Sequence, residues 1–324
     1  MTPPRNRRGP RPGPRNGASS PEESEVLSVR YAGPVGRVLS GSVREDRSGG
    51  APREHGVLHY EGRSVLDGTA NSLVVLRRLA VLHGSSDARA KKPVLDWAAR
   101  HALGHHDTWA AEVARRRAHA LRVLSARGRH VHRLELTADW RLVVGLGEQT
   151  GDHEFGVSLH GTYGWPVIPG STLKGAAAAW ARQQQVPAER YTEVFGSAAV
   201  PEDEEDSRGG RGRVRFLDAL PRAGCEPRRR LRVHSDVITP HQHAYHTESG
   251  AEPGAPGEHH QPIPLPFLSL SGAFVADLVG DDPGLVREAA EWLAHACREN
   301  GIGARTTAGY GYLTATSTDD WEQP

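Results

Sequence analysis

Residues 164–175, "GWPVIPGSTLKG", stand directly before the alanine-rich run "AAAAWAR" and predict the start of a helix. The Pro-Gly pair makes a turn, and the hydroxyl of Ser171 or Thr172 is a candidate N-cap. Lys174 then lies in the first turn, where the helix dipole disfavours a cation unless an anion is nearby. The stretch predicts either an anion site made of free backbone amides and Lys174, or an ordinary capped helix whose lysine turns into water.

The residues on both sides of this helix alternate between strand and helix patterns. Strands are predicted at 131–147 (or a bent hairpin there), 155–161, 213–220, 229–238, 264–279 and 311–317, and helices at 171–185 and 283–299. With the short strands set aside, the order is β-α-β-β-α-β. This order predicts an α+β protein with a ferredoxin-like (RRM-like) core enlarged by insertions.

The chain before this core has a different character. Residues 1–25 are rich in arginine and proline and predict a disordered head, because they contain almost nothing apolar. Residues 26–128 predict loops and a helical subregion, with helices at 71–84, 93–104 and 107–128, of which Asn71 and Asp107 are candidate N-caps. The core is expected at 129–316, followed by a tail at 317–324.

Composition limits the classes of function. The formal net charge is only +1, and the two cysteines, Cys225 and Cys297, lie far apart. This pattern favours two ordinary buried or half-buried thiols over a disulfide framework or a cysteine zinc site. The longest apolar run is too interrupted to span a bilayer and the N-terminus has no apolar signal core, so we expect a cytoplasmic protein without a cofactor.

A second glycine-rich junction lies at residues 301–311, "GIGARTTAGYG". Its four glycines remove β-carbons, which lets backbone amides approach a sugar-phosphate chain. Arg305 adds charge, Thr306 and Thr307 add hydroxyls, and Tyr310 offers a ring for stacking on a base. The alternative is a flexible connection between a helix and a strand. In a ferredoxin-like core this loop can lie near the start of the first helix.

The two motifs, in this order, resemble the paired signature of the RAMP superfamily, the RNA-binding proteins of CRISPR systems. The finer resemblance is to the family of the sixth subunit of the type III-B Cmr effector complex. It extends over about residues 69–316 and is supported by "HGTYG" at 160–164, "HSDVITPHQHAYH" at 234–246 and "ANSLVVLRRLAVL" at 70–82.

The resemblance implies a non-catalytic backbone subunit that binds the guide RNA near its 3′ end, on a complex that pairs with target RNA. It also implies contacts with other Cmr RAMP subunits, namely the repeated backbone subunit, the small helical subunit and the end-capping RAMP subunit. No catalytic or metal-binding residue is expected. The RNA-contact candidates are Gly170, Ser171, Thr172, Lys174, His160, Arg182, Gly301, Gly303, Arg305, Thr306, Gly309, Tyr310 and Gly311.

Three alternatives stay open. The first is a RAMP endoribonuclease with a histidine general base, for which the candidates are His160, His234, His241, His243 and His246. Asp152 and Asp236 are possible metal ligands for cleavage, but no carboxylate cluster has ligand spacing. The second is a metal-binding module at residues 241–246 with His259 and His260. The third is a purely structural scaffold.

A charged segment joins the two halves of the core. The acidic run "EDEED" at 202–206 precedes "SRGGRGR" at 207–213. A solvated loop is the simplest interpretation. The further hypothesis is that Arg208, Arg211 and Arg213 touch RNA or a neighbouring subunit while the acidic side stays in water.

Overall fold

The structure is a computed structural model that describes residues 27–31, 44–45, 57–60, 70–82, 87–147, 149–150, 153–154, 156–197, 210–239 and 264–322. The predicted head, the acidic run 202–206, Asp152, Arg208 and the histidines from His241 to His260 lie outside these ranges. Within them, no helix is both long and apolar enough to cross a bilayer.

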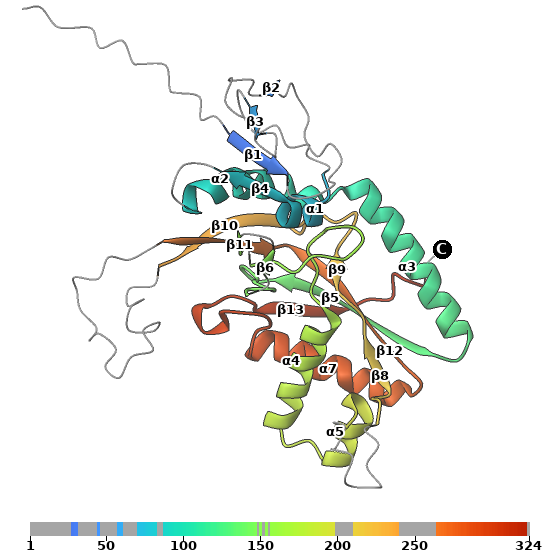
Figure 1. The fold of residues 1–324 in the computed structure, drawn as a ribbon. Helices are drawn as coiled ribbons and strands as arrows, with labels where there is room; N and C mark the ends of the chain where they lie inside the picture. Colours follow the sequence, from blue (N-terminus) through green and yellow to red (C-terminus); the bar gives the residue numbers. More distant parts are fainter. Residues whose placement is uncertain are drawn as a thin grey trace, which may run out of the picture.

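The core is an antiparallel sheet with two helices between its strands (Figure 1). The elements follow in the order β5 (His130–Ala138), α4 (Gly170–Gln183), β8 (Val214–Phe216), β12 (Ala273–Gly280), α7 (Pro283–Glu299) and β13 (Leu313–Ser317). Their order in the sheet is β13-β5-β12-β8, and β9 (Leu220–Pro221) pairs with β12. The first core strand therefore lies between the fourth and the third, as a ferredoxin-like core requires, which confirms the predicted α+β class.

Both faces of the sheet are covered by helices. Successive side chains of a strand point to opposite faces, so both sets of side chains in β5 are buried. Leu134 and Leu136 of β5 join the main apolar core with α4 and α7. Arg133 and Glu135 point to the other face and are also buried. On that face lies α3 (Asp107–Ala126), whose Leu121 packs with Val279 and Trp321.

Helix α7 matches its predicted bounds because Asp282 and Pro283 mark its start, and Asn300 and Gly301 mark its end. The carboxylate of Asp282 accepts hydrogen bonds from the amides of Gly284 and Leu285 at 2.8 and 3.0 Å. Pro283 occupies the first turn, where its missing amide costs nothing. Backbone hydrogen bonds to these amides also lower the pKa of Asp282.

The predicted strand at 264–279 is two strands. β11 (Leu265–Ser271) pairs with β10 (Arg232–Ile238) in a separate hairpin, and the chain then turns at Gly272 into β12. Gly272 has φ +111°, and a β-carbon there would lie 2.5 Å from the carbonyl oxygen of Arg230. Only glycine fits this turn, which moves the chain from the hairpin to the core sheet.

Other sequence predictions need correction. The described part of the predicted strand 155–161, residues 156–161, forms one isolated bridge between Leu159 and Pro166 and no longer strand, because the chain turns back there on itself. Helix α5 (Ala188–Phe195) and the short strands β6 (Gln149–Thr150) and β7 (His153–Glu154) were not predicted.

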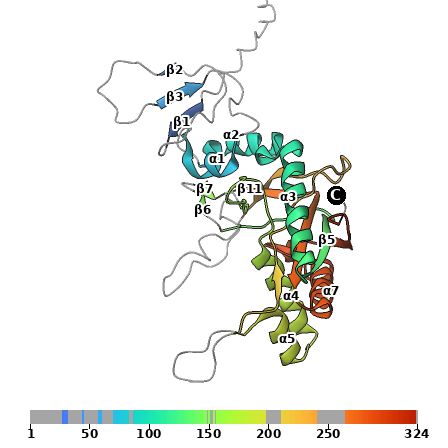
Figure 2. The same cartoon turned by 90° about the vertical axis from the view of Figure 1, so that its right-hand side faces the viewer.

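The N-terminal part contains strands that the prediction of loops and helices did not include. β1 (Leu27–Tyr31), β2 (Arg44–Glu45), β3 (Val57–Tyr60) and β4 (Leu79–Leu82) form a sheet in the order β2-β3-β1-β4. The strands β1, β2 and β3 lie at the end of the molecule opposite α5 (Figure 2). The predicted helix 71–84 is therefore only α1 (Ser72–Arg78), because pairing with β1 takes the next four residues.

The helix starts in this part differ from prediction at one of two positions. The side chain of Asn71 accepts a hydrogen bond from the amide of Leu73 at 3.0 Å, which confirms it as the N-cap of α1. Asp107 is instead the first residue of α3, after the N-cap residue His106. The remaining helices are α2 (Asp87–Arg100) and the short η1 (Ala102–Gly104).

His105 makes the stability of this part depend on pH. Its ring lies edge-on to Trp165 at 5.2 Å, and its Nε2 is buried without a partner in the described structure. Burial lowers the pKa of His105 from 6.5 to about 4, although the charge of Asp107 partly opposes the shift. Between about pH 6.5 and about pH 4, His105 binds a proton in the unfolded chain but stays neutral in the folded chain. The free energy of unfolding therefore falls by roughly 3 kcal/mol as the pH falls through this range.

We therefore expect His105→Phe to flatten the decline in stability over that pH window. Urea unfolding of both proteins at several pH values measures the difference, and His130→Phe serves as a control at an exposed position. Parallel curves for the wild type and His105→Phe would show that His105 titrates normally in the folded chain.

Candidate nucleic-acid interface

The start of α4 holds an anion, and that anion belongs to the protein. The amide of Gly170 donates to a carboxylate oxygen of Asp218 at 2.7 Å. The N-cap residue is Pro169, and Ser171 lies inside the first turn with an exposed side chain that makes no capping hydrogen bond. The predicted cap at Ser171 is therefore wrong. Gly170 is needed because a β-carbon would lie 2.1 Å from the carbonyl oxygen of Phe216. Asp218 thus supplies the negative charge that the helix dipole favours.

The other amides of the first turn are largely used as well. Those of Thr172 and Leu173 donate to the carbonyl oxygen of Pro169 at 2.9 and 3.1 Å. Fewer free amides are therefore available to an anion than the sequence predicted. An RNA phosphate here would also face the carboxylate of Asp218. Lys174 is half-buried on the same turn. Its contact with RNA stays a prediction.

Arg182 lies at the opposite end of α4. It is eight residues beyond Lys174, or about 12 Å along the helix. Its guanidinium donates to the hydroxyl of Tyr191 at 2.9 Å and lies over the same ring at 5.7 Å. The structure does not bring Arg182 and Lys174 into one site.

His160 organises the turn before α4. Its Nδ1 accepts hydrogen bonds from the amides of Thr162 and Tyr163 at 3.1 and 3.3 Å. The rings of His160, Tyr163 and Trp165 stack in sequence at 4.5 and 4.9 Å. These contacts explain the "HGTYG" pattern as a folded turn, and RNA contact by His160 stays a prediction.

The loop at 301–311 is a folded structure with left-handed backbone. Gly301, Gly303, Gly309 and Gly311 have φ between +70° and +88°, and Arg305 has φ +62°. The amide of Ala304 donates to Val143 at 2.8 Å and that of Gly311 to Arg141 at 2.7 Å. The loop is thus fixed to the segment after β5, although its conformation is one that L-residues disfavour.

The glycines of the loop 301–311 are needed for two different reasons. A β-carbon on Gly303 would lie 2.3 Å from the carbonyl oxygen of Val143, and one on Gly311 would lie 2.0 Å from that of Ile302. These two glycines allow the protein to pack against its own backbone. A β-carbon on Gly309 meets nothing within 4 Å, so only Gly309 faces open space. Thr306 packs internally against Gly301.

We expect Gly311→Ala to lower the free energy of unfolding by about 3 kcal/mol, because it adds a backbone clash to the cost of a left-handed alanine. Gly309→Ala carries only the conformational cost of about 1 kcal/mol and is the matched control. Chemical denaturation of both variants measures the difference. Equal losses would mean that the loop is less tightly packed than its contacts indicate.

Aromatic rings and arginines from three distant segments meet beside this loop. The rings of Trp140 and Tyr310 lie 4.8 Å apart, and the guanidinium of Arg141 lies 5.1 Å from the Trp140 ring centre. That of Arg305 lies 5.6 Å from the ring of Phe267. We name Trp140, Arg141, Phe267, Arg305 and Tyr310 the aromatic-arginine cluster. Trp140 is 51% exposed, which leaves a ring available for stacking.

Asp236 holds part of this cluster in place. Its carboxylate accepts hydrogen bonds from Tyr310 at 3.1 Å and from Ser269 at 2.5 Å, and it pairs with Arg141. Burial, and then the charge of Asp236, raise the pKa of the Tyr310 hydroxyl, so that this hydroxyl remains a donor. Asp236 was considered in the sequence as a metal ligand; the described residues contain no group of three His, Cys, Asp or Glu placed to hold a metal.

Arg305 has a buried donor that finds no acceptor among the described residues. Its Nε is buried without a hydrogen-bond partner, and no carboxylate of the described residues forms an ion pair with it. A buried donor that lacks an acceptor costs about 1–3 kcal/mol. Arg305 therefore combines an unsatisfied donor with a left-handed backbone, and such features are common at binding sites.

The two predicted junctions lie at opposite edges of the core sheet. Gly170 contacts β8, whereas the loop leads into β13 (Figure 1). The loop instead meets Trp140 and Arg141 after β5 and Asp236 and Phe267 of the hairpin. Sequence reasoning did not single out Trp140 or Arg141. The available signal was an adjacent aromatic and arginine directly after an alternating strand.

Comparison with known proteins identifies the family. The model of the RAMP superfamily matches residues 135–314, which include the whole aromatic-arginine cluster. The Cmr6 subunit of the CRISPR system Cmr from Pyrococcus furiosus is 28% identical over 221 residues, covering 53% of this chain. The match spans 64% of that relative's own length.

Solved structures were also compared with the chain, and the first of the two described next has a similar fold. A chain of the type III-B Cmr-beta bound to cognate target RNA aligns with a TM-score of 0.54 at 20% identity, covering 73% of this chain and 78% of that one. The crystal structure of Cmr6 from Pyrococcus furiosus aligns with a TM-score of 0.35 at 25% identity, covering 58% and 98%. With its ferredoxin-like sheet and a family match over more than half its length, the chain belongs to the RAMP superfamily.

Proposed function

We propose that this chain is a non-catalytic, guide-RNA-binding subunit of a type III-B CRISPR effector complex. Its membership of the RAMP superfamily and its similarity to a Cmr6 subunit support the assembly. In this role the protein holds the backbone of the guide, and base pairing reads the target RNA. Other Cmr RAMP subunits are its proposed neighbours.

The observation that carries the proposal is the aromatic-arginine cluster beside the loop 301–311. Exposed rings that stack on bases, next to cations that neutralise phosphates, are the usual means of binding single-stranded RNA. Trp140 supplies the exposed ring, and Arg305 supplies a charge that no described carboxylate pairs with. Gly309 leaves open space for the sugar-phosphate chain.

This mode of binding is directed at the backbone. Stacking tolerates every base, and phosphate contacts carry no sequence information. Affinity for unstructured RNA is therefore expected to depend little on sequence. It is also expected to fall with salt, by about 0.7 in the logarithmic slope for each phosphate neutralised.

Co-purification from native cells, followed by sequencing of the bound RNA, tests the assignment. The proposal predicts other Cmr subunits together with RNA of discrete guide length. Incubation of the purified chain with labelled RNA tests the nuclease alternative. A lone protein that cuts RNA, and loses that activity when one histidine is replaced, would contradict the non-catalytic role.

A further inference from the structure

A second basic site lies far from the loop 301–311. A cleft of about 300 Å³ is lined by Arg129, Arg211, Gly212, Arg213, Arg215, Gly280 and Asp281, and we name it the arginine cleft. Arg129 directly precedes β5, Gly280 ends β12, and Arg215 lies on the edge strand β8. The lining thus contains four arginines and a single carboxylate residue.

The backbone that carries these arginines is fixed. Arg211 forms a β-bridge with Gly196, and the amide of Arg213 donates to the carbonyl oxygen of Glu193 at 2.8 Å. A β-carbon on Gly212 would lie 2.4 Å from the carbonyl oxygen of Val194. The backbone at residues 211–213 is therefore in place before any ligand arrives, which lowers the entropy cost of binding.

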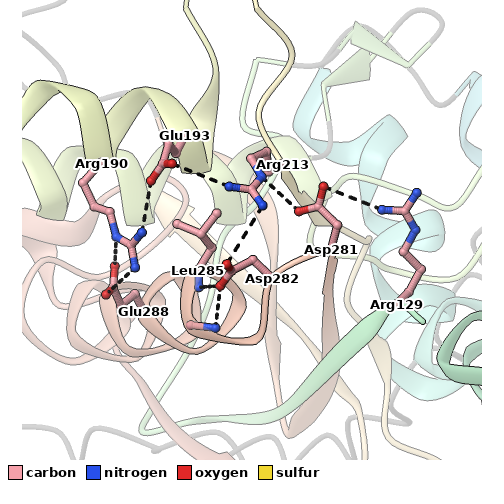
Figure 3. Close-up of polar contacts among 9 residues, drawn as sticks. Arg129, Arg190, Glu193, Arg213, Asp281, Asp282, Leu285 and Glu288 are labelled. Atoms are coloured by element: carbon pink, nitrogen blue, oxygen red, sulfur yellow. Dashed lines mark hydrogen bonds and ion pairs between the residues drawn. The ribbon is translucent and has the colours of Figure 1, made fainter.

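Their charges are unevenly neutralised (Figure 3). Arg213 pairs with Asp281 at 3.0 Å, with Glu193 at 3.5 Å and with Asp282 at 4.0 Å, while Arg129 lies 3.9 Å from Asp281. Arg213 is thus held by the protein itself. In contrast, Arg211 and Arg215 are exposed and form no ion pair with any described carboxylate. Among the described residues, no carboxylate neutralises these two charges, which are therefore available to a ligand.

We infer that the arginine cleft binds the phosphate backbone of RNA as a second contact, separate from the aromatic-arginine cluster. Arginine forks match the two oxygens of a phosphate group. The lining holds no apolar side chain, whereas the centre of a protein–protein interface is apolar and poor in charge. The lining therefore favours RNA over a protein partner.

The position of the cleft adds a length requirement. Arg129 precedes the first residue of β5, and Arg141, which anchors the loop 301–311, follows its last. A strand of 9 residues is about 30 Å long, so the two sites lie at opposite ends of the sheet. At a stacked rise of about 3.4 Å per nucleotide, one RNA must contain roughly nine nucleotides between them. The inference rests on the proposed function, because it concerns the same RNA.

The test uses the full chain and an unstructured RNA of about 20 nucleotides, long enough to span both sites. Arg211→Ala/Arg215→Ala removes the two unpaired charges, and Arg115→Ala/Arg116→Ala on the exposed face of α3 is the matched control. The dissociation constant is measured over a salt series. We expect the cleft variant to bind roughly 25-fold more weakly at about 0.1 M salt, with a slope reduced by about 1.4, and the control to match the wild type.

A third variant, Arg305→Ala, separates the two claims. Its effect on affinity is expected to add to that of the cleft variant, because the sites are distant and independent. Wild-type affinity and slope in the cleft variant, with weaker binding in Arg305→Ala, would overturn the cleft and leave the proposed function standing. Absence of RNA binding by the wild type would overturn both. Normal RNA binding with lost assembly in the cleft variant would make the cleft a protein interface instead.

Discussion

Replacing Trp140 and Arg305 together by alanine is expected to weaken RNA binding by about a hundredfold. A base stacked on an aromatic ring contributes about 1–3 kcal/mol, and a hydrogen bond to a charged group about 1.5–3 kcal/mol. Their combined loss of roughly 3 kcal/mol corresponds to about two powers of ten in affinity. Fluorescence anisotropy with a labelled, unstructured RNA measures this loss.

The fold should survive this double substitution. Trp140 is half-exposed, and Arg305 makes no ion pair within the described structure. Trp109→Ala on α3 removes a tryptophan that is 53% exposed and does not belong to the cluster, so it is the matched control. Arg305→Gly adds a second control, because glycine relieves the left-handed backbone. It should lose RNA affinity without any loss of stability.

The largest effect on stability is expected from Asp277→Asn. Asp277 is fully buried in β12 and binds two arginines, Arg133 of β5 at 2.7 Å and Arg117 of α3 at 2.5 Å. The substitution removes the negative charge that both arginines bind, and only Arg133 keeps another described carboxylate partner, Asp320 at 3.0 Å. Removing one partner of a buried ion pair costs about 3–5 kcal/mol, which corresponds to a fall in Tm of roughly 10 °C.

Glu299→Gln is the matched control for that variant. It breaks an ion pair with Arg298 whose side chains are about half-exposed, and such surface pairs contribute at most about 1 kcal/mol. Thermal unfolding of the three proteins compares them directly. A similar Tm for Asp277→Asn and the wild type would mean that apolar packing, and not the buried ion pairs, attaches α3 to the sheet.

The sequence predicted the core because its signals are local. The alternation of Leu134 and Leu136 marked β5, and Asp282 with Pro283 marked the start of α7. The order of these elements was enough to predict the sheet, since few topologies satisfy β-α-β-β-α-β. The short strands β1 to β4 escaped prediction because their pairing joins distant segments with little periodicity.

The candidate site was predicted only in part, for the same reason. The loop 301–311 carries its signal in its own glycines, and the structure shows them in the left-handed conformation. Asp218, whose carboxylate accepts from the first amide of α4, is 48 residues away from Gly170, so no residue near Ser171 indicates it in the sequence. Asp236 meets Tyr310 across 74 residues. Contacts at such separations depend on the fold.

Ultraviolet cross-linking of the chain to its guide RNA, followed by mass spectrometry of the linked peptides, tests the central claim most directly. The account predicts cross-links at Trp140 or Tyr310, whose rings lie beside the loop 301–311. Substitution of Arg305 should reduce their yield. Cross-links confined to the start of α4, with none at Trp140 or Tyr310, would contradict the account.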